Sequence, residues 1–140
     1  MNWLTSSWPL IGDLIGAHLA IALPAIIASI LIAVPVGAWA QRSKIFGSPV
    51  LSFLSILYAV PSLPLLVVIP VILGIALRSR MNMVIVLTIY GVAVLIRQCA
   101  QAFAALPEDV LESADALGMS GLRRFFTVEL PLAIPVIVAG

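Results

Sequence analysis

The chain of 140 residues is 63% hydrophobic, carries 9% charged residues and has a mean hydropathy of +1.24. Soluble domains usually carry about 25% charged residues, so lipid is expected to cover most of the surface. The formal net charge of +1 says nothing about nucleic acid, but the sequence has no basic patch with interleaved aromatic residues, so no nucleic-acid partner is expected. The single cysteine, Cys99, can form no intrachain disulfide and indicates no redox compartment.

The first apolar segment is predicted to be a retained membrane span. A secretory signal peptide begins with a basic region, whereas the first charged residue here is Asp13 and the first basic one is Arg42. The uncharged stretch between them would be roughly 42 Å long as a helix, against about 30 Å of bilayer core. We place the span at about residues 19–40. Trp3 and Trp8 are either interfacial anchors or part of an irregular N-terminal tail.

The second uncharged segment, residues 45–77, is too long for one straight span and too short for two, which would need about 40 residues. Four prolines interrupt it. Two of them lie three residues apart in the stretch YAVPSLPLL (58–66). We therefore predict one crossing at about residues 50–77 with a broken or kinked middle.

Two further apolar segments complete the chain. A third span is predicted at about residues 82–104, and a fourth runs from about residue 130 to residue 140. Residues 131–140 would cover only about 15 Å as a helix, half of the bilayer core, so we expect the chain to be incomplete at its C-terminus. Together the segments predict an all-α, polytopic transmembrane helical bundle in a single domain, with a polar loop at about residues 105–127.

The basic residues predict an orientation, because cytoplasmic loops carry an excess of Lys and Arg. With single crossings, Arg78 and Arg80 lie on one side and five basic residues lie on or near the other. The side with five is predicted to be cytoplasmic, which places the N-terminus outside and the polar loop inside. These five are Arg42, Lys44, Arg97, Arg123 and Arg124. If residues 45–77 formed a re-entrant hairpin, the split would be four to three and the polar loop would lie outside.

The polar loop is predicted to form two short helices joined at a glycine. Pro107 suits the first helical position, and Glu108 and Asp109 follow in the first turn, where the helix dipole favours acids. Gly118 suits the left-handed residue that ends this helix, and Ser120 can cap the second. Each helix has an apolar face. The two faces are Val110, Leu111, Ala114 and Leu117, and then Leu122, Phe125 and Phe126. These faces rest either on the membrane interface and the protein's own spans, or on a partner protein.

The stretch ESADALGMSGLRRFFTVELPL (112–132) resembles the motif E-A-A-x3-G-x9-I-x-L-P of the permeases of binding-protein-dependent ABC importers. The matching residues are Glu112, Ala114, Gly118, Leu130 and Pro131. Ser113 replaces an alanine of the motif, and Val128 replaces an isoleucine. The stretches YAVPSLPLL, IYGVAVLIR and LGMSGLRRFFTVELPLAIPVIVAG are most similar to the osmoprotectant branch of this family, which imports glycine betaine, choline or carnitine.

This resemblance implies a type I ABC importer permease fold and a multi-pass location in the inner (plasma) membrane. It also implies that the polar loop is a coupling helix that docks on an ATPase subunit. The residues implied at this contact are Glu112, Ser113, Ala114, Leu117, Gly118, Leu130 and Pro131. The implied partners are a cytoplasmic ATPase dimer, a second permease subunit of the same or another kind, and an extracytoplasmic binding protein. ATP hydrolysis would belong to the ATPase, so this chain is expected to be no enzyme and to hold no cofactor.

The sequence supports the residues of a translocation path less strongly than it supports those of the polar loop. Arg97 lies inside the third predicted span, where an ionisable residue is a functional candidate unless it snorkels to the interface. Pro61, Ser62 and Pro64 could expose backbone carbonyls to a pathway or form a packing kink.

No Walker A, HExxH, CxxC or GxSxG pattern occurs, so no catalytic or metal site is predicted. The alternatives are a permease for another small solute, such as an amino acid or a sulfonate, and a non-transporting membrane scaffold. A secondary transporter is disfavoured, because its coupling acids would lie within the membrane and the acids here lie outside the predicted spans.

Overall fold

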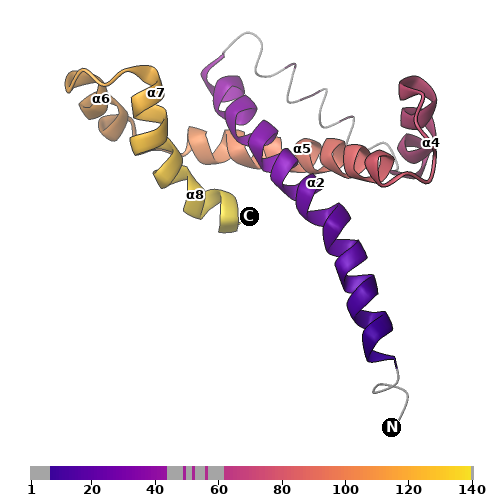
Figure 1. The fold of residues 1–140 in the computed structure, drawn as a ribbon. Coiled ribbons are helices and arrows are strands. Elements are labelled where there is room, and N and C mark those ends of the chain that lie inside the picture. Colours follow the sequence, from indigo (N-terminus) through magenta and orange to yellow (C-terminus); the bar gives the residue numbers. More distant parts are fainter. Residues whose placement is uncertain (1–6, 44–48, 50–51, 53–55, 57–61, 140) are drawn as a thin grey trace.

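The computed structural model describes residues 7–43, 49, 52, 56 and 62–139 (Figure 1). Over these residues the chain is helical without strands, as the all-α prediction requires. The elements are α2 (Trp8–Arg42), α4 (Ser62–Leu73), α5 (Arg80–Ala104), α6 (Glu108–Ala116), α7 (Gly121–Arg124), the π turn η1 (Phe125–Glu129) and α8 (Leu130–Ala139).

Two of these helices, α2 and α5, are long and apolar enough to cross a membrane. Helix α5 begins two residues before the span predicted at 82–104 and ends with it. Helix α2 begins at Trp8, well before the span predicted at 19–40, and Pro9 lies in its first turn, where proline is tolerated. Trp8 is therefore helical and 68% exposed, not part of an irregular tail, whereas Trp3 lies outside the described residues.

The contact between α2 and α5 is built on small residues. Ala25, Ser29, Ala33 and Gly37 recur every four positions on α2, and all four are buried. A Cβ atom added at Gly37 would lie 2.6 Å from the Cβ of Cys99. Small side chains let helix backbones approach closely, which is how membrane helices associate without a hydrophobic driving force between them.

The same contact shows that α2 and α5 run in the same direction. The Ser29 Oγ donates to Ala25 O at 2.7 Å and to Thr88 O at 3.2 Å, and farther along both helices Gly37 lies against Cys99. The chain therefore returns from the C-terminal end of α2 to the N-terminal end of α5. Figure 1 shows the N-terminal half of α2 extending beyond α5.

Helix α4 lies beside the start of α5, and a buried asparagine holds the corner between them. Asn82 Nδ2 donates to Leu66 O at 3.0 Å and to Leu77 O at 2.8 Å, while Ser79 Oγ accepts the Asn82 N–H at 3.1 Å and caps α5. Helix α4 begins at Ser62, within the stretch 58–66 where a break or kink is predicted, and Pro64 lies in its first turn. Residues 58–61 lie outside the described chain.

The second short helix of the polar loop is not separate from the fourth span. Helix α7, the π turn η1 and α8 follow one another without interruption from Gly121 to Ala139. The Leu130 N–H donates to Phe125 O, the wider spacing of a π turn. Pro131 has no N–H and its ring clashes with the carbonyl four residues back in a regular helix, so a wider turn before it lets the helix continue.

Because Gly37 has no room for a side chain, Gly37→Ala should weaken the packing of α2 on α5. Gly16 lies on the same helix with no atom within 4 Å of an added Cβ, so Gly16→Ala is the matched control with the same gain in helix propensity. We expect the free energy of unfolding in mild detergent to fall by about 1–3 kcal/mol for Gly37→Ala relative to Gly16→Ala. Equal stability of the two variants would contradict the close packing.

Candidate functional site

The polar loop lies where the C-terminal ends of α2 and α5 meet the start of α8 (Figure 1). Its first helix, α6, follows Pro107, which is the N-cap residue rather than the first helical residue, one position earlier than predicted. Glu108 and Asp109 occupy the first turn, where the helix dipole favours negative charge. Ala114, which is 3% exposed, is the buried residue on the apolar side of α6.

Helix α6 ends at a left-handed glycine, as predicted. Gly118 has a φ of +71°, and its N–H donates to Asp115 O at 2.9 Å. The Met119 N–H donates to Ala114 O at 3.2 Å. These two bonds form a Schellman motif, which satisfies carbonyls that the helix end would leave unpaired. The chain turns sharply here because glycine adopts this conformation at little cost.

Helix α7 begins at the predicted position, but its first turn is not capped as predicted. Ser120 is the N-cap residue, yet its side chain makes no capping hydrogen bond. The apolar face predicted for this helix is divided between two environments. Phe125 stacks on Phe103 of α5 at a centroid distance of 5.8 Å, whereas Leu122 and Phe126 are 76% and 63% exposed.

The residues predicted at a coupling contact also divide into two groups. Glu112, Ser113, Leu117 and Gly118 are exposed, and Leu117 is 76% exposed. Of the predicted apolar face, Ala114 is buried and Val110 and Leu111 are half-buried, whereas Leu117 is exposed. In contrast Ala114 is buried, Leu130 packs against the core cluster, and Pro131 is exposed on α8.

A chain of four charged side chains links the elements of this site. Glu129, which is 4% exposed, accepts hydrogen bonds from Arg42 at the end of α2 and from Arg124 of α7. The Arg124 Nε lies 2.7 Å from Glu129 Oε1. The same guanidinium contacts both carboxylate oxygens of Asp115 on α6. The hydrogen bond to Asp115, followed by that to Glu129, raises the pKa of Arg124 above its ordinary value.

Sequence analysis missed this network. Arg42 and Glu129 are 87 positions apart, so no local spacing relates them. One signal was present, because Glu129 is the lone acid in the otherwise uncharged stretch FFTVELPLAIP (125–135). A carboxylate in such surroundings requires partners, since burying an unpaired charge is costly.

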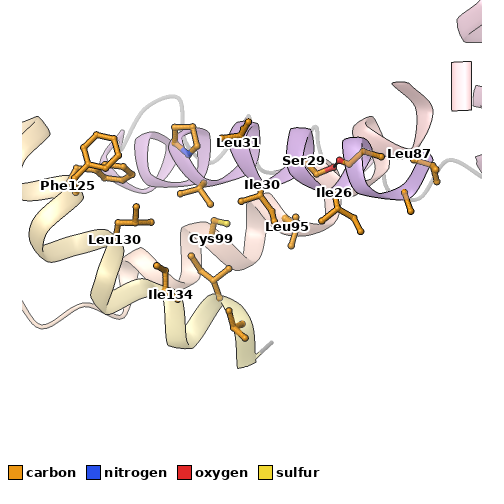
Figure 2. Close-up of a pocket in the computed structure, with 18 of the residues that line it drawn as sticks. Ile26, Ser29, Ile30, Leu31, Leu87, Leu95, Cys99, Phe125, Leu130 and Ile134 are labelled. Atoms are coloured by element: carbon orange, nitrogen blue, oxygen red, sulfur yellow. Dashed lines mark hydrogen bonds between the residues drawn. The ribbon is translucent and has the colours of Figure 1, made fainter. Parts of the chain in front are cut away.

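An apolar groove of about 940 Å³ lies between α2, α5 and α8. Figure 2 shows Ile26 and Ile30 of α2, Leu95 of α5 and Ile134 of α8 around this space. Neither Pro64 nor Arg97 lines it. Its lining offers almost no polar groups, so it is suited to an apolar neighbour and not to a charged solute.

The candidate path residues are not brought together. Pro64 is exposed on α4, which packs near Asn82 at the start of α5. Arg97 lies fifteen positions after Asn82, about 22 Å farther along α5. Its side chain is exposed and makes no ion pair within the described chain. Pro61 and the side chain of Ser62 lie outside the described residues. No group of three or more His, Cys, Asp or Glu able to hold a metal occurs among the described residues.

These features are those of an α-helical protein with two helices able to cross a membrane and a structured polar loop at one end of them. The chain belongs to the family described as binding-protein-dependent transport system inner membrane component, whose model matches residues 25–140. The match includes α5, the polar loop and α8, together with the C-terminal half of α2.

Three of the relatives that the chain is similar to are transport permeases. A glycine betaine/carnitine/choline transport system permease protein of Bacillus subtilis (strain 168) is 34% identical over 125 residues, covering 89% of this chain and 56% of that protein. A carnitine transport permease protein of Listeria monocytogenes is 33% identical over 99% of this chain and 59% of its own length. A glycine betaine/proline betaine transport system permease protein of Escherichia coli (strain K12) is 31% identical, covering 87% of this chain and 34% of that protein.

The chain thus spans about half the length of the first two of these relatives. No solved structure matches it.

The backbone of Gly118 gives a local test of the loop. An L side chain in the left-handed region costs about 1–2 kcal/mol, so Gly118→Ala should open the Schellman turn more often. We expect amide hydrogen exchange at Met119 to accelerate about tenfold. Gly121→Ala is the matched control, because Gly121 has open space around it and no positive φ. Unchanged exchange in Gly118→Ala would show that the turn does not depend on this conformation.

Proposed function

We propose that this chain forms part of the membrane-spanning permease of an ATP-driven ABC importer for an osmoprotectant such as glycine betaine, choline or carnitine. The observation that carries the proposal is the exposed loop around Gly118, which has the residues of the family motif and lies at one end of two parallel spans. The substrate class is supported by the names of the relatives, which are permeases for these compounds.

The proposed orientation has the N-terminus outside and the polar loop in the cytoplasm. Its support is the distribution of charge in the fold. Arg42, Arg123 and Arg124 lie at the end of the helix pair that carries the loop, while Arg78 and Arg80 lie at the start of α5. The parallel course of α2 and α5 is what a single crossing of residues 50–77 would produce, whereas a re-entrant hairpin would leave the two helices antiparallel.

We propose that the exposed part of the loop docks on a cytoplasmic ATPase subunit. Leu117 and Leu122 flank the Gly118 turn, and each is 76% exposed. Exposed large apolar residues beside a sharp turn are suited to the interior of a protein contact, and Glu112 adds a charge at its edge. The competing interpretation is that these side chains rest on the membrane interface.

The proposed mechanism assigns separate tasks to separate chains. A binding protein delivers the solute from outside, and two permease subunits form the path. Closure of the ATPase dimer moves the polar loop and changes the access of the path from outside to inside. This chain contributes spans at about residues 50–77, 82–104 and 130–140 and the helix that extends the 19–40 span. It supplies no ATP chemistry.

Topology can be tested by thiol labelling in intact cells. Single cysteines at Ser7 and Ser120, in a Cys99→Ala background, should react with an impermeant maleimide from opposite sides of the membrane. We expect Ser7→Cys to react in intact cells and Ser120→Cys only after permeabilisation. Reaction of Ser120→Cys from outside would overturn the orientation and place the loop away from any ATPase.

The function is tested with the complete permease, its ATPase and its binding protein in proteoliposomes. We expect ATP-dependent uptake of radiolabelled glycine betaine, and Glu112→Lys to lower both uptake and recovery of the ATPase on purification. The loss should be about tenfold, because reversing a charge at a protein contact costs on the order of 1–3 kcal/mol.

Ser113→Ala is the matched control for this experiment. Ser113 is adjacent to Glu112, and its hydroxyl donates to Asp109 O within α6 at 2.7 Å. Alanine is the residue of the family motif at this position, and the change removes only this local bond, so docking and uptake should be unchanged. If neither Glu112→Lys nor Gly118→Val lowers ATPase recovery at equal abundance in the membrane, the loop rests on the interface and the scaffold alternative is favoured.

A further inference from the structure

Glu129 is the meeting point of two arginines from distant parts of the chain. It ends the π turn η1, its side chain is 5% exposed, and it contacts Arg42 through one oxygen and Arg124 through the other. A buried carboxylate persists where its charge is balanced and its oxygens are hydrogen-bonded. Here the two guanidinium groups provide both, so the three side chains form one unit.

Arg124 extends this unit across the turn at Gly118. Its guanidinium also contacts Asp115 on α6, so the order of charges is Asp115, Arg124, Glu129 and Arg42, alternating in sign. The four residues belong to α6, α7, η1 and α2. Both halves of the polar loop are therefore fixed to the C-terminal end of α2 through a single buried carboxylate.

The end of α2 is in turn closely packed on α5. Gly37 is one and a half turns before Arg42, and an added Cβ there would lie 3.1 Å from the backbone nitrogen of Ala100. Backbone-to-backbone contact of this kind resists sliding, because no flexible side chain separates the helices. A displacement of Arg42 is thus passed to both long helices.

We propose that Glu129 is a positioning residue that ties the coupling loop to α2, so that movement imposed on the loop by the ATPase displaces α2 and α5 as well as α8. This inference rests on the function proposed above and extends it. Without the link, movement of the loop would reach α8, which continues directly from α7 and η1, and α5, whose Phe103 stacks on Phe125, but it would reach α2 only through α5. The link requires charge at Glu129, because an uncharged side chain would leave Arg42 without its counter-charge, whereas Arg124 would keep Asp115.

The test uses the complete transporter in proteoliposomes and measures ATPase recovery, ATP hydrolysis and glycine betaine uptake. Glu129→Gln and Arg42→Gln should each keep the ATPase bound, yet lower the uptake per ATP hydrolysed about tenfold. The double variant Arg42→Gln/Glu129→Gln should lose no more than the stronger single variant, because both changes remove the same contact. Arg42→Lys keeps the charge and should retain most of the coupling.

Arg123→Gln is the matched control. Arg123 precedes Arg124, is exposed, and makes no ion pair in the part of the chain that the structure describes. It should transport as the unmodified protein does. A loss of coupling in Glu129→Gln that Arg42→Lys does not share, at equal abundance and thermal stability, supports the link.

Three results would overturn the proposal, and they are distinguishable. Normal uptake per ATP in Glu129→Gln, or losses in Arg42→Gln and Glu129→Gln that multiply in the double variant, would overturn the link while the proposed function stands. Failure of the unmodified permease to bind an ATPase would remove the proposed function, and this inference with it.

Discussion

The close approach of α2 to α5 determines the rest of this structure. Membrane helices gain little from excluding lipid from one another, so their contact depends on packing at short range. The row of small residues ending at Gly37 makes that approach possible, and Ser29 adds a hydrogen bond to Thr88 O. With these two helices fixed and parallel, the end of α2, the end of α5 and the start of α8 come together, and the polar loop has a defined place.

Two separate requirements determine the structure of the polar loop. Its backbone must reverse direction within a few residues, and Gly118 does so at low cost through its positive φ. The charge of Glu129 must be satisfied where apolar helices surround it, and Arg124 pairs with it while also binding the exposed Asp115. The turn exposes Leu117 and Leu122, while the ion pairs prevent the loop from separating from the helices below it. The exposed part of the loop is thereby held in one arrangement relative to the helices.

Sequence predicted the features that depend on neighbouring residues. The limits of α5, the end of α6 at Gly118 and the acidic first turn follow from patterns within a few positions. Apolar composition does not show where a helix begins, so the sequence did not indicate that α2 extends from the predicted span back to Trp8. Other features depend on distant contacts. The position of Arg97, exposed and unpaired within the described chain, could not be derived without knowing which side of α5 faces α2.

Glu129 illustrates why the site could be only half predicted. The motif that the loop resembles places no requirement on this position, and the neighbouring matches, Leu130 and Pro131, drew attention to packing. Pro131 cannot donate a hydrogen bond, and the π turn before it gives the helix an extra residue per turn at Glu129. An extra residue changes which side chains after α7 share its face. The contact of Glu129 with Arg42 therefore depends on an irregular turn as well as on a partner 87 positions away, and neither is visible to an analysis based on regular helical spacing.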